Sequence, residues 1–405
     1  MRVLNIGLGA RTAQSNATGH AAEWTREISR LVGEYVSVTE GDGEDATPVR
    51  LADNATAYTL RCHPLAYPFA AAAFAERLHR REPFDLCTAE DPVRSGLAGA
   101  LFSRRTGVPL NVENPAFHVH DPAGPHARAC QPIYYRIGLR VLRQADSIRN
   151  YSPDQDAALI QLGIPRDRID CIPHPFPEVA ATDRAACRKR LNLGANDRMV
   201  LRAGRMVPYE NVGALLGAFA IMRRNCAARL FLVGDGPCRR GWEARARDLG
   251  LADAVTWAGA VPEGDMPGYY AAADVFVAPA IQETGPRTVL EALAANCPVI
   301  VTPRMGVVRY GICEHERTAF VVPHDDVSAM ASAMRQMLED TEQARAMAAL
   351  GRERALDRCA LGRVAREVAS VFRETVQRVD LEASVRGVDS ALVSAGRTPE
   401  LRLEV

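Results

Sequence analysis

Short apolar runs alternate with helical patterns along the first half of the chain. The strand-like runs cover residues 3–7, 36–39, 84–89, 108–113, 145–150 and 169–173. Helical patterns cover residues 18–32, 93–105 and 152–163. In the last of these, Ser152 suits the N-cap, Pro153 the first helical position and Gly163 the C-terminal end. Apolar strands that alternate with helices predict a parallel, doubly wound sheet.

The same alternation starts again after residues 173–183, whose prolines suit a linker. Strand-like runs follow at 198–204, 228–236, 254–259, 274–280 and 297–302. Helical patterns follow at 211–224, 240–250, 265–273, 288–296, 326–338, 341–356 and 360–376. The second half therefore predicts another doubly wound sheet.

We expect an α/β protein with domains at residues 1–175 and 185–359, joined by a linker at 176–184. The helix at about 360–376 is expected to rejoin the first domain, and residues 377–405 form a polar tail with little pattern. Ligands of such sheets bind at the carboxyl ends of the strands, and clefts between domains favour them.

Composition excludes two broad classes of protein. The 405 residues are 47% hydrophobic and 24% charged, as in folded globular chains, so wholesale disorder is excluded. The 49 basic residues balance 49 acidic ones, which argues against binding to nucleic acid by charge alone. Lys189 is the only lysine, so the basic residues are almost all arginines, as a GC-rich bacterial gene would encode.

The cysteines and the apolar runs bear on the cellular compartment. The ten cysteines include no Cys-x-x-Cys pair, and several lie in apolar runs, such as Cys87 and Cys297. This pattern indicates buried, reduced thiols and neither a zinc site nor a disulfide framework. The N-terminus has no apolar stretch suited to a signal peptide, and no run approaches the ~18–20 apolar residues of a membrane span. We therefore expect a cytoplasmic protein.

The segment with the most informative chemistry covers residues 273–302. A strand leads into a loop that carries Glu283, and Gly285 opens a helix that contains Glu291. A second strand follows directly. This strand–loop–helix–strand order places two acidic residues, with seven residues between them, beside a helix start.

The start of such a helix is an anion site, because its free amides and the positive end of its dipole face outward. A diphosphate could rest on the amides near Arg287 and Thr288. Glu291 could then accept hydrogen bonds from a ribose diol, and Glu283 could meet a sugar.

The spacing of Glu283 and Glu291 resembles the Glu-x7-Glu signature of the family 4 glycosyltransferases, which are retaining enzymes of the GT-B fold. Further stretches are similar to motifs of that family in the same order: 89–101, 141–152, 162–176, 203–220, 230–237 and 255–261. The resemblance covers about residues 1–375. It implies two Rossmann-like domains that face a central cleft.

The resemblance also implies roles for matching positions. Arg205 would contact the donor diphosphate. Glu283 would hydrogen-bond the transferred sugar and help to stabilise its positive charge, and Glu291 would hold the nucleotide ribose. Gly234 and Gly236 would let the backbone turn tightly near the nucleotide.

The first domain would contribute the loop from Asn16 to Gly19, which would face the donor phosphates. Transfer would retain the anomeric configuration, and enzymes of this kind typically need no metal or other cofactor. Positioning and the stabilisation of an oxocarbenium-like centre beside a departing diphosphate would supply the catalysis.

One departure from the family's pattern concerns charge. Glu210 stands where a lysine usually follows the conserved arginine, so an acid replaces the base that offsets the leaving diphosphate. Either another cation must then compensate, or the donor must sit differently. Arg202, Arg287 and Arg304 are candidates, and Arg287 is the best placed.

Two further departures lie in the first domain. The family's Gly-Gly pair appears only as Ala17-Thr18-Gly19. A histidine often found after the fourth strand aligns with Pro115, and His118 or His120 could substitute from the same loop.

Other functions compete with this interpretation. Gly7-Leu8-Gly9 after one strand, with Glu40 ending the next, imitates the dinucleotide fingerprint of a nicotinamide-dependent oxidoreductase, but Thr12 replaces the third glycine. A GT-B enzyme with altered chemistry is a second alternative: an epimerase, a phosphorylase or a cyclitol-coupling enzyme. A non-catalytic protein that binds nucleotides or glycans is a third.

The sequence as a whole predicts a retaining glycosyltransferase that moves a hexose-type sugar from a UDP- or GDP-linked donor to a glycan, a glycolipid or a natural product. Arginine-rich helix faces could help the protein to approach a membrane-bound acceptor. No nucleic acid partner is expected.

Overall fold

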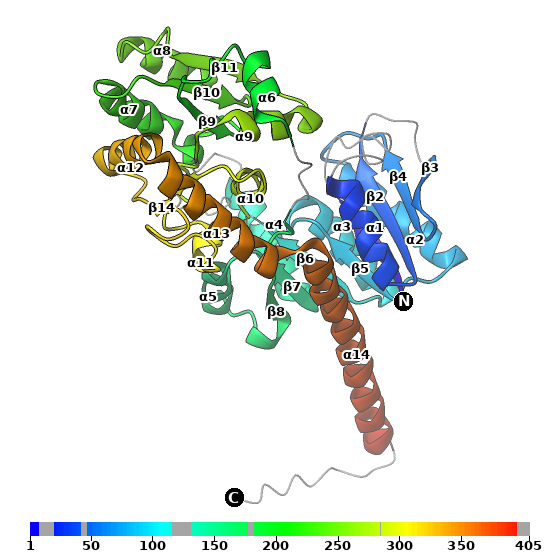
Figure 1. Ribbon diagram of the computed structural model, residues 1–405. Helices are drawn as coiled ribbons and strands as arrows, with labels where there is room; N and C mark the ends of the chain where they lie inside the picture. Colours follow the sequence, from blue (N-terminus) through cyan, green and yellow to red (C-terminus); the bar gives the residue numbers. More distant parts are fainter. Residues whose placement is uncertain (8–19, 42–46, 116–130, 177–181, 284, 395–405) are drawn as a thin grey trace, which may run out of the picture.

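The computed structural model describes residues 1–7, 20–41, 47–115, 131–176, 182–283 and 285–394, without the side chains of residues 20, 21, 131 and 386–394. In these residues the strands form two separate sheets, each covered by helices (Figure 1). The expected α/β architecture with two doubly wound sheets is therefore confirmed.

The first sheet has eight strands within the described residues, in the order β3-β4-β2-β1-β5-β6-β7-β8. Its strands are β1 (Arg2–Ile6), β2 (Glu34–Glu40), β3 (Pro48–Ala52), β4 (Ala55–Leu60), β5 (Leu86–Ala89), β6 (Leu110–Asn114), β7 (Ser147–Asn150) and β8 (Ile169–Cys171). Its helices are α1 (His20–Leu31), α2 (Tyr67–Arg81), α3 (Arg94–Thr106), α4 (Gln131–Gln144) and α5 (Pro153–Gln161). The pairing is parallel except between β3 and β4, which form an antiparallel hairpin at the edge.

The second sheet is parallel, with the strand order β11-β10-β9-β12-β13-β14. Its strands are β9 (Met199–Ala203), β10 (Arg229–Val233), β11 (Val255–Gly259), β12 (Val275–Val277), β13 (Val299–Val301) and β14 (Phe320–Val321). The helices of this half are α6 (Arg184–Arg190), α7 (Val212–Arg223), α8 (Arg239–Asp248), α9 (Met266–Ala272), α10 (Arg287–Ala294), α11 (Gly306–Arg309), α12 (Val327–Glu339) and α13 (Thr341–Cys359). Short 3-10 turns are η3 (Arg166–Arg168), η4 (Pro208–Glu210) and η5 (Glu263–Asp265).

Local sequence signals account for several helix ends. Asp183, Asp326 and Asp340 accept hydrogen bonds from backbone amides at the starts of α6, α12 and α13. Ser152 precedes α5 as expected, but its side chain makes no capping hydrogen bond there. Gly163 follows that helix with a left-handed φ of 81°, which glycine adopts without strain.

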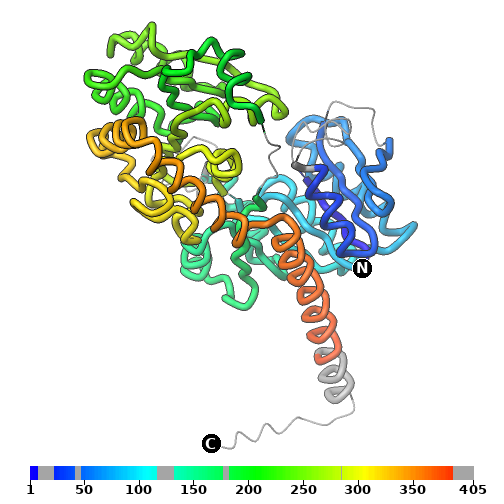
Figure 2. The backbone as a smooth tube through the Cα atoms, viewed as in Figure 1, coloured from blue at the N-terminus to red at the C-terminus, as the bar shows by residue number. Residues whose placement is uncertain are grey.

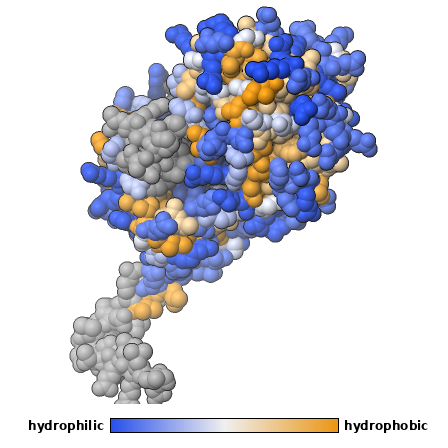
Figure 3. Space-filling view, turned by 90° about the vertical axis from the view of Figure 1, so that its left-hand side faces the viewer, coloured by the Kyte–Doolittle hydropathy of each residue, from blue (hydrophilic) through white to orange (hydrophobic). Residues whose placement is uncertain are grey.

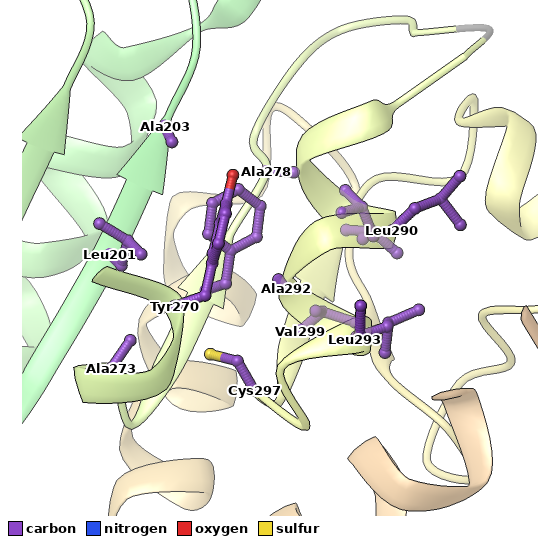
Figure 4. Packing of buried hydrophobic residues seen from close by; sticks show 14 of the residues in the cluster. Leu201, Ala203, Tyr270, Ala273, Ala278, Leu290, Ala292, Leu293, Cys297 and Val299 are labelled. Carbon is purple, nitrogen blue, oxygen red and sulfur yellow. The ribbon is translucent and has the colours of Figure 1, made fainter. Parts of the chain in front are cut away.

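Apolar residues fill both faces of the second sheet. On one face, the ring of Tyr270 lies beside Leu201 and Ala203 of β9 and Ala292 of α10 (Figure 4). Cys297 packs into the same cluster as a buried free thiol, and burial raises its pKa. The prediction of buried, reduced cysteines is thus confirmed for this residue.

The chain crosses between its two halves at neighbouring points, which can be followed in Figure 2. The amide of Phe176, entering the second half, donates to the carbonyl of Cys359 on the way back, at 2.5 Å. Two further contacts join the halves: Arg309 with Asp154, and the hydroxyl of Tyr310 with the Cys171 sulfur, at 3.0 Å. The halves therefore touch close to both crossings.

Helix α14 (Leu361–Ser394) returns the chain to the first sheet and packs against α1. Val364, Val368, Ala369 and Phe372 are buried in a cluster with residues of β1 and α1. The Thr375 hydroxyl also hydrogen-bonds the Ser147 hydroxyl, at 2.7 Å. Helix α14 therefore packs as part of the first half of the chain.

Helix α14 continues past the expected end at residue 376 and projects from the body of the molecule (Figure 1). The side chains of Leu381 and Val385 are 66% and 53% exposed. A space-filling view of one face shows a hydrophobic patch beside the grey end of the chain, among mainly hydrophilic residues (Figure 3). Within the described residues, α14 and the other helices are too short or too polar to span a bilayer.

We predict that a chain ending at residue 362 loses the folded first half, whereas a chain ending at residue 380 keeps it. The shorter chain lacks the buried side chains of Val364, Val368, Val371 and Phe372, each of which contributes about 1.5–3 kcal/mol. Thermal unfolding of the two truncated chains measures this difference. Equal unfolding midpoints would contradict the assignment of α14 to the first core.

Candidate functional site

Glu283 lies in the loop after β12, and its backbone is fixed against the loop after β13. It forms an isolated parallel bridge with Met305. The Gly306 amide donates to the Glu283 carbonyl, at 2.9 Å. Because β12 and β13 are parallel neighbours, both loops leave the sheet at its carboxyl edge. Glu283 therefore stands at the edge where ligands of such sheets bind.

The loop after β9 reaches the same place. The Ile281 amide donates to the Tyr209 carbonyl at 2.9 Å, which ties this loop to the one that carries Glu283. Arg205 is exposed, donates to the Tyr209 hydroxyl and lies 5.7 Å from the centre of its ring. The predicted donor-site residues Arg205 and Glu283 are thus brought together.

The carboxyl of Glu283 has an unusual titration. Burial and, to a lesser extent, the charge of Glu210 raise its pKa to about 7, although Arg205 and Arg202 oppose the shift. Near neutral pH, Glu283 therefore exchanges readily between its neutral and charged forms.

Glu210, the acid in the family's lysine position, lies at the end of η4 and is 14% exposed. Its Oε2 atom is 2.9 Å from a guanidinium nitrogen of Arg202, whose side chain is 1% exposed. Arg202 was one of three cations expected to offset the diphosphate in place of the missing lysine, and it instead contacts Glu210.

Glu291 lies on α10 and is 8% exposed. It accepts hydrogen bonds from the Tyr270 hydroxyl at 2.7 Å and from Nε of Arg287 at 2.8 Å. Arg287 also pairs with Glu263 of η5. The guanidinium of Arg287 is therefore already held by two carboxylates, although we expected its charge to serve a diphosphate.

The first turn of α10 begins at Arg287, and Thr288 follows it, half-buried. Gly285 precedes this turn, and a Cβ atom there would approach the His174 ring to 3.3 Å. His174 in turn stacks on Tyr151, with their ring centres 5.5 Å apart. The helix start thus borders residues of the first half, which our sequence analysis did not include in the site.

Gly234 and Gly236 form the tight turn after β10 that was predicted near the nucleotide. Their φ angles are 116° and 156°. A Cβ atom at Gly234 would lie 2.0 Å from the Gly204 carbonyl oxygen, and one at Gly236 would lie 2.5 Å from that of Met206. Two backbones approach so closely here that only glycine fits.

Some predicted positions fall elsewhere. Gly19 and His118 lie outside the described residues. The third cationic candidate, Arg304, accepts a long backbone hydrogen bond from the Glu283 amide, at 3.4 Å. Within the part of the chain that the structure describes, no group of three His, Cys, Asp or Glu side chains is arranged to hold a metal ion.

We predict that Gly234→Ala lowers the free energy of unfolding by at least about 2 kcal/mol, because the new Cβ meets a carbonyl and the φ angle is unfavourable. Gly241→Ala is the matched control, since its Cβ would enter open space in α8. That change should gain up to about 1 kcal/mol. Urea unfolding measures both, and equal effects would refute the close approach.

We predict that wild-type protein loses stability relative to Glu283→Gln as the pH rises from about 4.5 to about 7. The folded state holds the Glu283 proton more tightly than the unfolded state, so its ionisation between these values favours unfolding. Unfolding midpoints across this range test the expectation. A constant difference between the two proteins would mean that the Glu283 pKa is not raised.

Two family models match the chain, one on each half. Residues 183–354 match the model described as "Glycosyl transferases group 1", and residues 17–175 match the "Glycosyl transferase 4-like domain". Together they cover the described strands of both sheets except β1. The matched region of the second half contains the loops around Arg205 and Glu283.

Several curated proteins have similar sequences. A GDP-mannose-dependent alpha-(1-6)-phosphatidylinositol monomannoside mannosyltransferase of Mycobacterium tuberculosis is 36% identical over 44% of this chain. That match spans about half of the relative's own length, 47%. A 2-deoxystreptamine glucosyltransferase of Streptomyces kanamyceticus is 27% identical over 70% of this chain and 76% of its own.

Solved structures agree in fold. A sucrose-phosphate synthase from Thermosynechococcus elongatus superposes with a TM-score of 0.77 at 21% identity, covering 92% of this chain and 99% of that one. HepE of Anabaena, solved with UDP-glucose, superposes with a TM-score of 0.73 at 19% identity, covering 92% and 99%. With its two parallel-sheet domains and its two matching family models, this chain belongs to the family 4 glycosyltransferases of the GT-B fold.

Proposed function

We propose that this protein is a retaining glycosyltransferase that moves a hexose from a UDP- or GDP-linked sugar to an acceptor hydroxyl. The observation that carries the proposal is the meeting of Glu283 and Arg205 at one edge of the second sheet, through the hydrogen bond from Ile281 to Tyr209. This edge places a carboxyl group and a cation beside the start of α10.

Each group at this edge has a task that suits its chemistry. The first-turn amides of α10 and the guanidinium of Arg205 bind the donor diphosphate, since both offer positive charge and donors. Glu291 accepts hydrogen bonds from the ribose. The turns at Gly234 and Gly236 let the nucleotide approach the backbone.

Glu283 acts on the transferred sugar. The bond between the anomeric carbon and the diphosphate breaks, and the acceptor oxygen bonds to the same face of that carbon, so the configuration is retained. The departing diphosphate takes the electron pair of the broken bond, and one of its oxygens accepts the proton that the acceptor hydroxyl loses. The Glu283 carboxylate stabilises the positive charge that develops on the sugar. Because Arg205 and the α10 amides supply the positive charge that the diphosphate needs, we expect transfer without a metal ion.

The relatives support this class of reaction and both donor bases. The Mycobacterium tuberculosis relative is described as GDP-mannose-dependent, and HepE was solved with UDP-glucose. A glycan, a glycolipid or a natural product remains our proposal for the acceptor, and we expect the reaction in the cytoplasm. A lipid-linked acceptor would bring the protein into peripheral contact with a membrane.

Glu210 favours a second candidate function within the same fold. An acid at a position usually held by a lysine suits an epimerase, a phosphorylase, a cyclitol-coupling enzyme or a non-catalytic nucleotide- or glycan-binding protein. All of these alternatives would bind the donor at the same site, but they differ in the reaction, if any, that follows binding. Nucleotide binding without sugar transfer or donor hydrolysis would favour the non-catalytic form.

We predict that UDP or GDP raises the thermal midpoint of the protein, whereas NAD does not. A ligand at about 100 times its dissociation constant adds about 2.7 kcal/mol to stability, which such an experiment detects. The panel contains UDP, GDP, ADP, dTDP, CDP and NAD at millimolar concentration. A shift with NAD alone would instead indicate an oxidoreductase.

We predict that Glu283→Ala lowers transfer at least about 100-fold and spares binding of the nucleoside diphosphate, because Glu283 acts on the sugar. Arg205→Ala should weaken that binding about tenfold, since a charged hydrogen bond is lost. Arg287→Ala should weaken it markedly if Arg287 compensates for the missing lysine. Arg317→Ala, at an exposed pair with Glu314, is the control. Near-full activity of Glu283→Ala would refute its role.

A further inference from the structure

Arg202 is a charged residue inside a buried strand. It belongs to β9, whose five residues are all buried, and only 1% of its side chain is exposed. A buried guanidinium is costly unless its donors are paired. Its partners therefore show what it does.

The partners of Arg202 all lie in the loop between β9 and α7. Its Nη1 atom donates to the Gly204 carbonyl at 2.7 Å, and its Nη2 atom donates to the Arg205 carbonyl at 2.8 Å. Nη2 also lies 2.9 Å from the carboxylate of Glu210. One guanidinium thus ties the beginning of the loop to its end.

Gly204 shows how closely the loop is fitted to this guanidinium. Its φ angle is 138°, and a Cβ atom there would lie 3.3 Å from Nη2 of Arg202. The two carbonyls that Arg202 binds flank the Arg205 residue on its N-terminal and C-terminal sides. The backbone on each side of Arg205 is therefore fixed, which limits the directions that its exposed side chain can take.

Arg202 cannot itself reach a donor phosphate in this arrangement. Only 1% of its side chain is exposed, and both of its terminal nitrogens are directed at atoms of the loop. An arginine that replaced the lysine directly would need an N–H group exposed to the diphosphate. The contacts suit a residue that acts through its neighbours.

We propose that the Arg202–Glu210 ion pair takes the place of the missing lysine by fixing the loop after β9, so that Arg202 is a positioning residue that directs Arg205 at the donor diphosphate. The pair also neutralises the negative charge of Glu210 with a buried cation, so that this charge does not repel the diphosphate. This inference rests on the proposed function, because it concerns the same donor site.

A double-mutant cycle tests the proposal. The variants are Arg202→Met, Glu210→Met and the double substitution, which replaces both charges by apolar groups of similar length. Each variant is measured twice: by the thermal midpoint, and by the dissociation constant of the nucleoside diphosphate that binds wild-type protein. Arg317→Ala again serves as the control.

Arg202→Met should raise the dissociation constant about tenfold, because Glu210 is left with an unneutralised charge near the diphosphate and the loop is released. The double variant should bind more tightly than Arg202→Met alone. Such a recovery shows coupling between the two residues, which independent losses of packing do not give.

The Glu210→Lys substitution makes the test more specific. Glu210→Lys should weaken nucleotide binding and lower the midpoint, since it sets a second cation beside buried Arg202. Arg202→Met combined with Glu210→Lys should recover both. If Arg202→Met does not fold, Arg202→Lys replaces it, since one ammonium cannot bind two carbonyls and a carboxylate with the geometry of the guanidinium fork.

Three outcomes would overturn the proposal. Unchanged nucleotide affinity in folded Arg202→Met or Arg202→Lys would leave Arg202 a purely structural residue. Fold-changes that simply multiply in the double variant would show that the pair does not act as a unit. If Arg202 and Glu210 were coupled in the thermal midpoint but not in the dissociation constant, the pair would contribute to stability alone.

Failure of the proposed function gives a different result. In that case wild-type protein binds none of the nucleoside diphosphates, whereas the thermal midpoints still show coupling between Arg202 and Glu210. The pair would then be structural, and its assignment to a donor site would be withdrawn.

Discussion

One backbone hydrogen bond holds the candidate site together: the Ile281 amide donates to the Tyr209 carbonyl. It joins the loop after β12 to the loop after β9, and these loops carry Glu283 and Arg205. The side-chain amide of Asn211 strengthens the junction by donating to the carbonyls of Pro279 and His324. Parallel strands make this junction possible, because their carboxyl ends meet at one edge. The hydrogen bond therefore keeps the carboxyl and the cation, which lie on separate loops, in one site.

At this edge of the sheet, each charged residue is balanced by the residues that it contacts, even where its charge differs from the one usual in the family. Glu210 is an acid where its family uses a base, yet its carboxylate contacts the buried guanidinium of Arg202. Its charge still raises the pKa of Glu283, which Arg205 and Arg202 lower. A single substitution in this set therefore alters several groups at once, since each charge acts on its neighbours across a few ångströms of weakly screening protein.

Sequence patterns predicted the two sheets well, because alternating apolar runs and helices are local signals. They missed the β3–β4 hairpin, whose edge strand contains no buried residue, although the two-residue turn Asp53-Asn54 is a sequence signal for a hairpin. The pairing of Arg287 with Glu291 could also have been predicted from their spacing of four residues on a helix. The partner of Glu210 could not, because an arginine within an apolar strand gives no indication of which loop residue it will meet.

The neighbouring crossings at Phe176 and Cys359 have a consequence for the order of folding. The second sheet is built from one continuous stretch of chain, between these crossings, so its contacts are complete before α14 leaves the ribosome. The first sheet is synthesised earlier, but its core lacks Val364, Val368 and Phe372 until the C-terminal helix arrives. The first domain is therefore the last to complete its fold. Its apolar surface near α1 stays exposed until α14 has been synthesised.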